Sequence, residues 1–351
     1  MFATRIAKLY PGAIDQRAIN EAAELLERGG LVVFPTETVY GIAANLLNKQ
    51  ALGRLKKIKD RPQDKEFSIH IGDKRDIEKY AVDVLPRAYK VLERFWPGPL
   101  TVVLPAPHGK SVGLRMPKNN IAFRLLNRCD FPVIAPSANL AGHPAPRTAE
   151  DAFSELNGLI ELVLDGGPTE LGTESTVLDA RRLPFTVLRD GVLKKEEILK
   201  VASRKEVLFV CTGNSCRSVM AEYLLRKKLM DAGRDDVDVS SAGTFAFFGM
   251  SPTRETLKLV QETGLDAAGH RAQRASADVL KQADIILVME NRHKEDVLRQ
   301  CPRCKDRVHV LGELAGLGQH DIEVPDPIGK SEEFYRMSFE KIKEAIRRLE
   351  I

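Results

Sequence analysis

Residues 207–228 read VLFVCTGNSCRSVMAEYLLRKK, in which an apolar run, a polar loop and a helical pattern follow one another directly. The apolar run, residues 207–210, contains β-branched and aromatic side chains, as a buried strand does. The helical pattern covers residues 220–232. Because a strand that leads through a short loop into a helix is the unit of α/β proteins, the second half of the chain is predicted to have an α/β fold.

The polar loop at residues 211–217 has the composition of a phosphate-binding cradle. Five residues separate Cys211 from Arg217, which is enough for backbone N–H groups to wrap a tetrahedral oxyanion at the positive end of a helix dipole. Gly213 is expected to allow the tight loop, and Arg217 to grip two phosphoryl oxygens. In that environment Cys211 is expected to be a thiolate at neutral pH, and Ser218 to hydrogen-bond its sulfur.

The rest of residues 201–351 extends this pattern. Further strand patterns lie at residues 237–240, 285–289 and 308–311, and further helical patterns at residues 252–263 and 332–349. Alternation of strands and helices predicts a parallel sheet wrapped by helices. A thiolate nucleophile also needs an acid that protonates the leaving group, and Asp326, which stands between two prolines, is the candidate.

The first half of the chain also alternates helical and strand patterns, which predicts a mixed α/β domain. Helical spacing covers residues 14–28 and 51–58, and strand patterns cover residues 31–34, 67–71, 100–104, 133–135, 159–164 and 185–188. Residues 35–41, PTETVYG, follow one of these strands directly. Hydroxyl, carboxylate and phenol groups at the carboxyl end of a strand suit a small polar ligand, although a capped turn would use the same threonines.

Cations gather in the loops and at the strand ends of this first half. They are Lys59, Arg61, Lys65, Arg115 and Arg189. Several cations that converge imply a polyphosphate ligand. Polar loops at residues 136–139 and 175–176 add hydroxyl and amide groups to the same half.

Length and composition indicate two globular domains without a membrane span. A chain of 351 residues exceeds what one hydrophobic core usually organises, and its 43% hydrophobic and 29% charged residues are ordinary for a globular protein. Residues 201–351 carry equal numbers of acidic and basic side chains, so the net charge of +4 belongs to residues 1–200 and indicates that this part handles anions. No apolar run approaches the about 18 residues of a membrane span, and the first ten residues are too polar for a signal peptide, so a cytoplasmic location is expected.

The cysteines stand at positions 129, 211, 216, 301 and 304. An odd number in this setting predicts free thiols of a reducing compartment and no disulfide framework. Cys301 and Cys304 have the spacing of half a zinc site, but the sequence has no second pair at ligand spacing, so no metal held by the protein is expected.

Residues 206–351 resemble the low-molecular-weight protein tyrosine phosphatases, which have a parallel-sheet, Rossmann-like fold. The matching stretches are the cradle with MAE at 220–222, SSAG at 240–243, ADIILVM at 283–289 and Asp326-Pro327. The resemblance implies that Cys211 is the nucleophile, Arg217 the phosphate clamp and Asp326 the general acid. It further implies a phosphocysteine intermediate that water hydrolyses, without a metal or cofactor.

The same resemblance implies a phosphate loop completed by Thr212, Gly213, Asn214, Ser215, Cys216 and Ser218. Cys216 matches a second loop cysteine that can protect the nucleophile as a reversible disulfide, and a small packing residue is the alternative interpretation.

Two places in this loop region bear on the substrate. Tyrosine-specific members have an apolar branched residue at the position of Ser215 and aromatic residues where this chain has Ile328 and Gly329. Ser215 leaves room and a hydrogen-bond acceptor for a guanidinium, which resembles the protein-arginine phosphatase branch. A phosphorylated protein, with phosphoarginine first and phosphotyrosine as the alternative, is therefore the expected substrate. The loop is also similar to that of thioredoxin-coupled arsenate reductases, for which Cys301 and Cys304 would have to be the resolving cysteines.

Residues ~10–192 resemble the threonylcarbamoyl-adenylate synthase family, which has the YrdC-like fold. The matching stretches are PTETVYG at 35–41, Lys59-x-Arg61, FWPGPLT at 95–101, APSAN at 135–139, DGGP at 165–168 and EST at 174–176. Two departures, Lys65-Glu66-Phe67 in place of a usual Pro-Leu ending and Asp190 in place of a common Pro, remove none of the ligands proposed below.

This second resemblance implies an open twisted α/β sheet with a basic concave cavity. There L-threonine, bicarbonate and ATP, the last with Mg²⁺, would give threonylcarbamoyl-AMP and pyrophosphate. The residues implied are Lys59, Arg61 and Arg189 for ATP, Thr36, His70, Arg115 and Ser175 for threonine, and Ser137 and Asn139 between the two ligands. His70 by itself is more simply interpreted as a strand histidine whose polar atoms are satisfied.

The chain is thus predicted to consist of a YrdC-like domain at residues 1–195, a linker at residues 196–205 and a phosphatase domain at residues 206–351. A threonylcarbamoyl transferase that modifies tRNA to threonylcarbamoyladenosine (t6A) is the expected downstream partner, and tRNA binding would accompany it. An inactive RNA-binding module is the alternative for the first domain.

Overall fold

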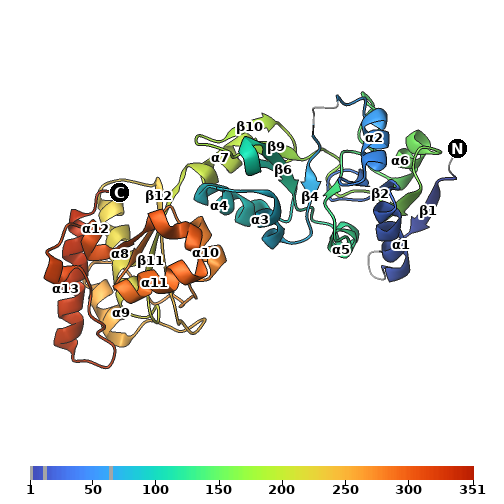
Figure 1. The fold of residues 1–351 in the computed structure, drawn as a ribbon. Helices are drawn as coiled ribbons and strands as arrows, with labels where there is room; N and C mark the ends of the chain where they lie inside the picture. Colours follow the sequence, from blue (N-terminus) through green and yellow to red (C-terminus); the bar gives the residue numbers. More distant parts are fainter. Residues whose placement is uncertain (1–2, 11–13, 63–65) are drawn as a thin grey trace. The chain divides into compact units, whose positions relative to one another are not determined.

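A computed structural model describes residues 3–10, 14–62 and 66–351 (Figure 1). The chain divides into two compact units, Met1–Leu85 with Val91–Lys200 and Pro86–Lys90 with Val201–Ile351. Helix α7 (Lys195–Ser203) occupies most of the segment predicted as a linker, and the predicted domain limits stay a prediction. Each helix in the described part of the chain is too short or too polar to cross a membrane.

The first unit is built on a mixed sheet of ten strands. The strands are β1 (Arg5–Lys8), β2 (Val32–Phe34), β3 (Gly41–Asn45), β4 (Ile69–His70), β5 (Leu100–Pro105), β6 (Ser111–Arg115), β7 (Val133–Ile134), β8 (Leu162–Asp165), β9 (Thr176–Asp179) and β10 (Thr186–Arg189). Their order is β1-β8-β2-β3-β7-β4-β6-β5-β9-β10. The pairs β1–β8, β2–β8, β4–β6 and β5–β9 are parallel, whereas β2–β3 and β5–β6 are antiparallel. The predicted α/β fold is confirmed.

The sequence patterns missed four of these strands: β1, β3, β6 and β9. Strand β3 reads GIAAN and β6 reads SVGLR, so glycine, alanine and polar residues replace the β-branched side chains that favour strands. Pairing makes β3 and β6 strands all the same, because each lies inside the sheet with a partner on both sides.

Helices of this part of the chain are α1 (Gln16–Glu27), α2 (Lys49–Ile58), α3 (Ile77–Tyr80), α4 (Pro86–Phe95), α5 (Asn120–Arg128) and α6 (Ala149–Leu156). Helix α1 begins at the Asp15 cap, whose side chain accepts from the backbone N–H of Arg17. Its buried face, Ile19, Ala22, Ala23 and Leu26, recurs every three to four residues. This face packs with α5 against β2, β3 and β8 and forms the core on that side of the sheet.

The second unit is built on four strands, β11 (Lys205–Cys211), β12 (Val237–Gly243), β13 (Ile285–Val288) and β14 (Val308–Val310). Their order is β12-β11-β13-β14 and each pair is parallel, as predicted. The helices are α8 (Arg217–Asp231), α9 (Arg254–Gln261), α10 (Ala277–Gln282), α11 (Asn291–Gln300), α12 (Leu311–Leu314) and α13 (Glu332–Arg348), which wrap the sheet (Figure 1).

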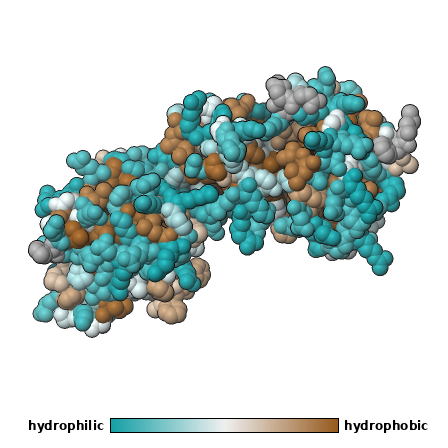
Figure 2. Space-filling view, viewed as in Figure 1, coloured by the Kyte–Doolittle hydropathy of each residue, from teal (hydrophilic) through white to brown (hydrophobic). Residues whose placement is uncertain are grey.

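Alternate residues of β11 face two separate cores. Val207 and Phe209 pack in the core that contains Cys211 and helices α8 and α13. Leu208 and Val210 pack in a second core with β14 and α10. A strand buried on both faces requires a continuous apolar run, which explains the sequence of residues 207–210. Most of the surface in view is hydrophilic, with smaller apolar patches, so the apolar side chains lie mainly inside (Figure 2).

One cysteine prediction is wrong. Cys301 and Cys304 form a disulfide, because the turn that starts the 3-10 helix Pro302–Arg307 brings their Cα atoms to 5.5 Å. The pair is buried in the core that contains Leu208 and Val210. Cys211 lies in the other core, so the disulfide and the cradle cysteine belong to opposite faces of the sheet. Cys129, Cys211 and Cys216 are free thiols.

Candidate active sites

A cavity of about 860 Å³ opens in the first unit, over one face of strands β5, β6 and β9 and beside the end of β4. Of the residues predicted to bind there, those that line it are Thr36, Lys59, Arg61, His70, Arg115, Ser137, Ser175 and Arg189. Asn139 is buried beside it and contacts Lys59. Lys65 lies outside the described residues. The structure therefore brings together residues that are up to 153 positions apart in the sequence.

The stretch after β2 is folded on itself by its own hydroxyls. Thr36 Oγ1 donates to the carbonyl of Val39 at 2.7 Å and accepts from the backbone N–H groups of Thr38 and Val39. Thr38 Oγ1 lies 2.8 Å from Thr36 Oγ1. These bonds satisfy the polar atoms of a buried turn, so PTETVYG is both a capped turn and a wall of the cavity.

Arg115, at the end of β6, is buried against a carboxylate that the sequence analysis left without a role. Its Nη2 donates to Glu37 Oε1 at 3.0 Å and to Thr38 Oγ1 at 2.7 Å. Glu37 Oε2 in turn accepts from the backbone N–H of Lys118. Burial lowers the pKa of Arg115, and the charge of Glu37 opposes that effect. Glu37 stands between Thr36 and Thr38 in the stretch predicted to bind a ligand, and this position could have indicated a role for it.

His70 stands opposite Arg115 in the parallel pair of β4 and β6. Its ring is edge-on to Phe34, with centroids 6.3 Å apart, and its Nδ1 has no partner in the described part of the chain. The ring also has a hydrogen bond with the backbone of Ser68, so the interpretation of His70 as a strand histidine stays a prediction. Burial, helped by the charge of Arg115, lowers the pKa of His70 to about 3, so the ring is neutral near pH 7.

Lys59 ties the end of α2 to the loop after β7. Its Nζ donates to the carbonyls of Ser137 at 3.1 Å and Asn139 at 2.8 Å, and to Asn139 Oδ1 at 3.0 Å. Burial lowers the pKa of Lys59. Arg61 donates to the carbonyl of Glu66, and its guanidinium lies 4.6 Å from the Phe67 ring centroid.

Arg189, at the end of β10, closes the cavity from the other side. Its Nη2 donates to the carbonyl of Ser175 at 2.8 Å, and its Nη1 lies 3.2 Å from Glu174 Oε2. Ser175 Oγ is 2.9 Å from Thr101 Oγ1. Glu174 also lines the cavity and was quoted in the EST stretch without a role. The described lining of the cavity thus joins six cations to hydroxyls and two carboxylates, an arrangement that suits an anionic ligand. The cations are Lys59, Arg61, Lys110, Arg115, Arg181 and Arg189.

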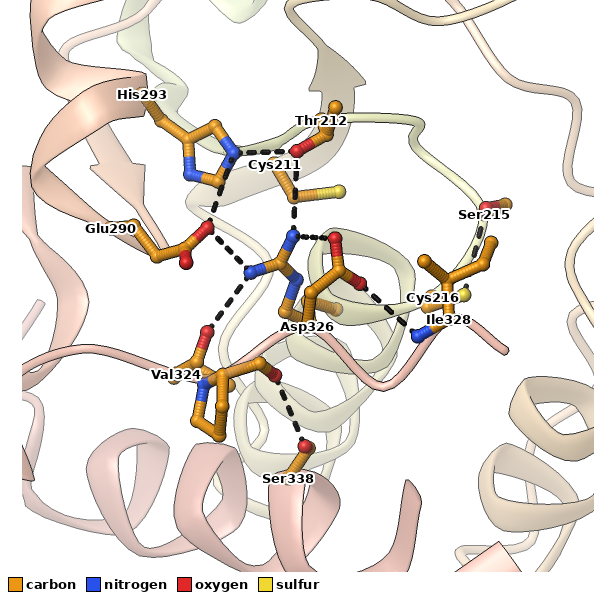
Figure 3. A network of polar contacts seen from close by, with 12 residues as sticks. Cys211, Thr212, Ser215, Cys216, Glu290, His293, Val324, Asp326, Ile328 and Ser338 are labelled. Atoms are coloured by element: carbon orange, nitrogen blue, oxygen red, sulfur yellow. Dashed lines mark hydrogen bonds and ion pairs between the residues drawn. The ribbon is translucent and has the colours of Figure 1, made fainter. Parts of the chain in front are cut away.

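The second unit holds the cradle, which runs from the end of β11 to the start of α8 (Figure 3). Cys211 Sγ lies 3.0 Å from Ser218 Oγ, the contact that the sequence predicted. The loop bends differently from the prediction, because Gly213 does not adopt a left-handed conformation and Asn214 does, with φ 53°. Asn214 is held there by bonds to Ser218, to Ser241 and from the backbone N–H of Gln273.

Arg217 is 1% exposed and lies between the carboxylates of Glu290 and Asp326. Its Nη1 donates to Glu290 Oε2 at 2.7 Å and to the carbonyl of Val324 at 3.0 Å. Its Nη2 donates to Asp326 Oδ2 at 2.6 Å and to Thr212 Oγ1 at 3.4 Å. Burial raises the pKa of Glu290, but hydrogen bonds from Arg217 and Arg292 outweigh that effect, so this pKa is lowered.

His293, on α11, lies beside Thr212 of the cradle (Figure 3). Its Nε2 lies 2.9 Å from Thr212 Oγ1 and 3.6 Å from Glu290 Oε2. Burial lowers the pKa of His293 to about 4, with a further contribution from the charge of Arg217. Neither Glu290 nor His293 was predicted as a site residue. Glu290 follows β13 directly, and the rule that polar groups at strand ends form sites would have indicated it.

The mouth of the cradle has polar and aromatic neighbours. Cys216 Sγ is buried among the hydroxyls of Ser215, Thr253 and Tyr335 at 3.5–3.7 Å. The segment after β12 runs beside the cradle, since the N–H of Thr244 donates to Cys211 and that of Phe245 to Thr212. In this segment Phe245, Phe247 and Phe248 are 64%, 77% and 91% exposed. These phenylalanines lie on another segment than Ile328 and Gly329, which stand where tyrosine-specific members have aromatic residues.

Comparison with known proteins divides the chain at the same place as the two units. A family model described as "Telomere recombination" (Sua5_yciO_yrdC) matches residues 24–191, and one described as "Low molecular weight phosphotyrosine protein phosphatase" matches residues 206–350. Both resemblances inferred from the motifs are thereby confirmed.

The chain is similar to the threonylcarbamoyl-AMP synthase of Pyrococcus abyssi, with 41% identity over 54% of this chain and 58% of the relative. It is 36% identical to the putative threonylcarbamoyl-AMP synthase of Mycobacterium tuberculosis, over 53% of this chain and 89% of the relative. The chain thus spans little more than half the length of the archaeal relative. Among solved structures, P. abyssi Sua5 complexed with L-threonine matches with a TM-score of 0.54 and 28% identity, over 87% of this chain and 98% of that chain.

Proposed function

The chain belongs to the threonylcarbamoyl-AMP synthase family, and we propose that its first unit converts L-threonine, bicarbonate and ATP into threonylcarbamoyl-AMP and pyrophosphate. The observation that carries this proposal is the 860 Å³ cavity in which Lys59, Arg61 and Arg189 converge on one ligand space. The solved relative that binds L-threonine supports the choice of amino acid.

The reaction assigns a task to each group in the cavity. Bicarbonate and the threonine amine form an N–C bond with loss of water, and a carbamate oxygen then attacks the α-phosphorus of ATP. The bond from the α-phosphorus to its bridging oxygen breaks, and pyrophosphate leaves with that electron pair. Lys59, Arg61 and Arg189 neutralise the departing charge, while Arg115, held by Glu37, meets the threonine carboxylate. Mg²⁺ would enter with the triphosphate, and the lining carboxylates Glu66 and Glu174 are the hard oxygen ligands that suit it.

The synthase proposal is tested by pyrophosphate release from the purified chain. Release should require both threonine and bicarbonate, and Lys59→Ala and Arg61→Ala should each lower it at least tenfold with ATP below saturation. A hydrogen bond to a charged group contributes about 1.5–3 kcal/mol, and about 1.4 kcal/mol is a factor of ten.

Lys57, an exposed lysine of α2 outside the cavity lining, supplies the matched control, since Lys57→Ala should keep the wild-type rate. Wild-type rates in both cavity variants would show that the triphosphate binds elsewhere. RNA binding without any threonine-dependent release would favour the alternative of an RNA-binding module. If threonine-dependent pyrophosphate release is observed, the expected downstream partner is a threonylcarbamoyl transferase that uses the product to form t6A on tRNA.

For the second unit we propose cysteine-dependent hydrolysis of phosphorylated protein. Cys211 Sγ attacks phosphorus, the bond to the leaving atom breaks, and Asp326 gives that atom a proton. A water molecule then attacks the phosphorus of the phosphocysteine and gives a proton to the Asp326 carboxylate. The S–P bond breaks, phosphate leaves, and Cys211 is again a thiolate. The contact of Cys211 with Ser218 and that of Arg217 with Asp326 support these roles, because they place the nucleophile, the phosphate clamp and the acid around the same cradle.

Phosphoarginine is the proposed substrate, because Ser215 is small and can accept a hydrogen bond beside the phosphorus. One observation favours the phosphotyrosine alternative, since the exposed phenylalanines at 245, 247 and 248 could stack on an aromatic phosphoester. Arsenate reduction is less favoured by the geometry. The two cysteines it would need as resolving thiols are already bonded to each other, in the core on the other face of the sheet.

The specificity proposal is tested by kcat/KM on phosphoarginine and phosphotyrosine peptides for wild type and Ser215→Ile. Wild type should prefer phosphoarginine. The isoleucine should shift the preference toward phosphotyrosine about ten- to hundredfold, because unsatisfied guanidinium N–H groups cost about 1–3 kcal/mol. A wild type that prefers phosphotyrosine would promote the tyrosine alternative. If the protein reduced arsenate with thioredoxin and had no phosphatase activity, the arsenate reductase alternative would be favoured.

A further inference from the structure

We propose that the Thr212 side chain is itself a hydrogen-bond donor to the phosphoryl group, and that His293 is the positioning residue that turns its hydroxyl proton into the cradle. The inference rests on the proposed phosphatase function and adds two residues to it. Phosphate loops of this kind bind mainly through backbone N–H groups and one arginine, so a side-chain hydroxyl is an additional donor.

Two nitrogen atoms lie against Thr212 Oγ1. Arg217 Nη2 is 3.4 Å away and His293 Nε2 is 2.9 Å away. A guanidinium can only donate, so the hydroxyl oxygen accepts from Arg217. The direction of the bond with His293 depends on which ring nitrogen carries the proton.

The buried surroundings of His293 select the tautomer. The side chain is 1% exposed and its Nδ1 has no partner in the described part of the chain. A proton on Nδ1 would leave a buried N–H group without an acceptor, which proteins rarely tolerate. A proton on Nε2 instead points at Thr212 Oγ1, with the Glu290 carboxylate 3.6 Å from the same nitrogen. The neutral ring therefore carries its proton on Nε2.

With this tautomer, Thr212 Oγ1 accepts two hydrogen bonds, and both of its lone pairs are used. Its own proton cannot point at either donor and must take the remaining direction. Thr212 is only half-buried, whereas Arg217 behind it is buried. A phosphoryl oxygen that Arg217 Nη2 grips lies within reach of a hydroxyl 3.4 Å from that nitrogen. The hydroxyl thus faces the charge that develops on phosphorus, where a preorganised donor is most effective.

The first arm of the test measures binding and needs no turnover. Titration calorimetry with inorganic phosphate and orthovanadate compares wild type with Thr212→Val, which removes the hydroxyl at similar volume, and Thr212→Ser, which keeps it. Thr212→Val should weaken the binding of both oxyanions at least about tenfold, because a hydrogen bond to a charged group is lost. Thr212→Ser should bind them as wild type does. Thr263→Val, which removes a hydroxyl bonded to the Val260 carbonyl at the end of α9, is the matched control and should bind like wild type.

The second arm tests the positioning role. His293→Gln can place an amide N–H near the position of Nε2, whereas His293→Leu cannot donate. The leucine should weaken oxyanion binding as Thr212→Val does, the glutamine should rescue it, and the double variant Thr212→Val/His293→Leu should be no weaker than Thr212→Val alone. A merely structural histidine would instead give additive losses.

The third arm observes the tautomer directly. In ¹⁵N spectra of histidine-labelled protein, the pair of signals lost in His293→Gln should show a protonated Nε2 and an unprotonated Nδ1. A protonated Nδ1, or a Thr212→Val variant that binds phosphate and vanadate as wild type does, would overturn the inference. Hydrolysis of p-nitrophenyl phosphate, measured beside these arms, reports on the proposed function separately, because a wild type that binds oxyanions without turning over an ester would contradict only the latter.

Discussion

Arg217 shows how a buried cation is kept ready for an anion. At 1% exposure an unpaired guanidinium would be very unfavourable, and ion pairs with Glu290 and Asp326 compensate the charge. Asp326 is 29% exposed and Glu290 18%, so Asp326 is the more accessible of the two carboxylates. A phosphoryl group can therefore take the place of Asp326 on Nη2 and leave that carboxyl free to serve as the acid, while Glu290 continues to orient the guanidinium.

His70 makes the first unit sensitive to acid. Its pKa is about 3 in the folded chain and about 6.5 in an unfolded one, so below pH 6.5 the unfolded state binds the proton that the folded state does not. The free energy of unfolding should therefore fall as pH falls from 6.5 toward 3, by about 2 kcal/mol at pH 5 from this group alone. His70→Gln removes this titrating group. The free energy of unfolding of wild type, measured relative to that of the variant, should therefore fall by about 2 kcal/mol between pH 7 and pH 5.

The chain's single tryptophan makes this measurable for the first unit alone. Trp96 is buried there, with its Nε1 bonded to the Leu100 carbonyl, so its fluorescence reports urea unfolding of that unit. The control is His108→Gln at an exposed turn, which should run parallel to wild type across the same pH range. If the free energies of unfolding of wild type and His70→Gln changed in parallel with pH, the assignment of a neutral, buried His70 would be contradicted.

At the scale of the element, strands β11 and β12 set the shape of the cradle. Their parallel register puts Cys211 opposite Gly243, and β12 carries no side chain at that point. A Cβ on Gly243 would lie 2.5 Å from the Thr212 carbonyl oxygen and 2.8 Å from the Asn214 nitrogen. The absence of a side chain, with ordinary backbone angles, is therefore what lets the cradle close over the strand end.

Gly243→Ala should push the cradle backbone out of shape while leaving the sheet intact. Overpacking of this kind costs about 1–3 kcal/mol, so the unit should stay folded but bind inorganic phosphate at least about tenfold more weakly. Circular dichroism and phosphate titration check the two parts of the expectation. Gly269→Ala, where a Cβ meets nothing within 4 Å, should change neither, and tight phosphate binding by Gly243→Ala would refute this account of the cradle.

At the scale of the whole molecule, two sites stand on two separate cores. The first-unit core joins α1, α5 and strands β2, β3 and β8, and the second unit has its own cores on both faces of β11. The described residues that line the first-unit cavity include no cysteine. The two proposed activities should therefore be independent.

Cys211→Ser tests this independence. Phosphoester hydrolysis should disappear, because the serine hydroxyl stays protonated at neutral pH, while threonine- and bicarbonate-dependent pyrophosphate release continues at the wild-type rate. Both assays are run on the same preparation of the full chain. Loss of both activities in a folded variant would contradict the assignment of two enzymes to one chain.

Much of the second unit follows from one contiguous stretch. The strand, the cradle and the helix start lie within residues 207–228, so their mutual geometry depends on local backbone preferences that a sequence displays directly. Cys211, Arg217 and Ser218 could be assigned for this reason. Within the same stretch the glycine was a misleading signal, because side-chain bonds to Ser218 and Ser241 hold Asn214 in the left-handed conformation.

What surrounds Arg217 depends on distant segments. Glu290 is 73 positions away and Asp326 is 109, and Thr212 meets His293 across 81 positions. The Asp-Pro pair made Asp326 recognisable, but no pattern along the chain shows that Glu290 and His293 converge on the cradle. Their approach follows from the parallel order of β11 and β13, which brings the carboxyl ends of both strands to one edge of the sheet.

The same distinction explains the first unit, whereas the disulfide is an exception to it. Lys59 was identifiable as a loop cation, and Arg115 and Arg189 as cations at strand ends. The bonds of Lys59 to the loop at Ser137 and of Arg115 to Glu37 required the folded sheet. Cys301 and Cys304 differ only in that a local turn, not a long-range contact, brings their Cα atoms together. Sequence patterns report short-range preferences of the backbone and the division of apolar from polar faces. Contacts between remote side chains arise from the packing of the sheet, because burial there forces polar groups to find partners wherever the fold has put them.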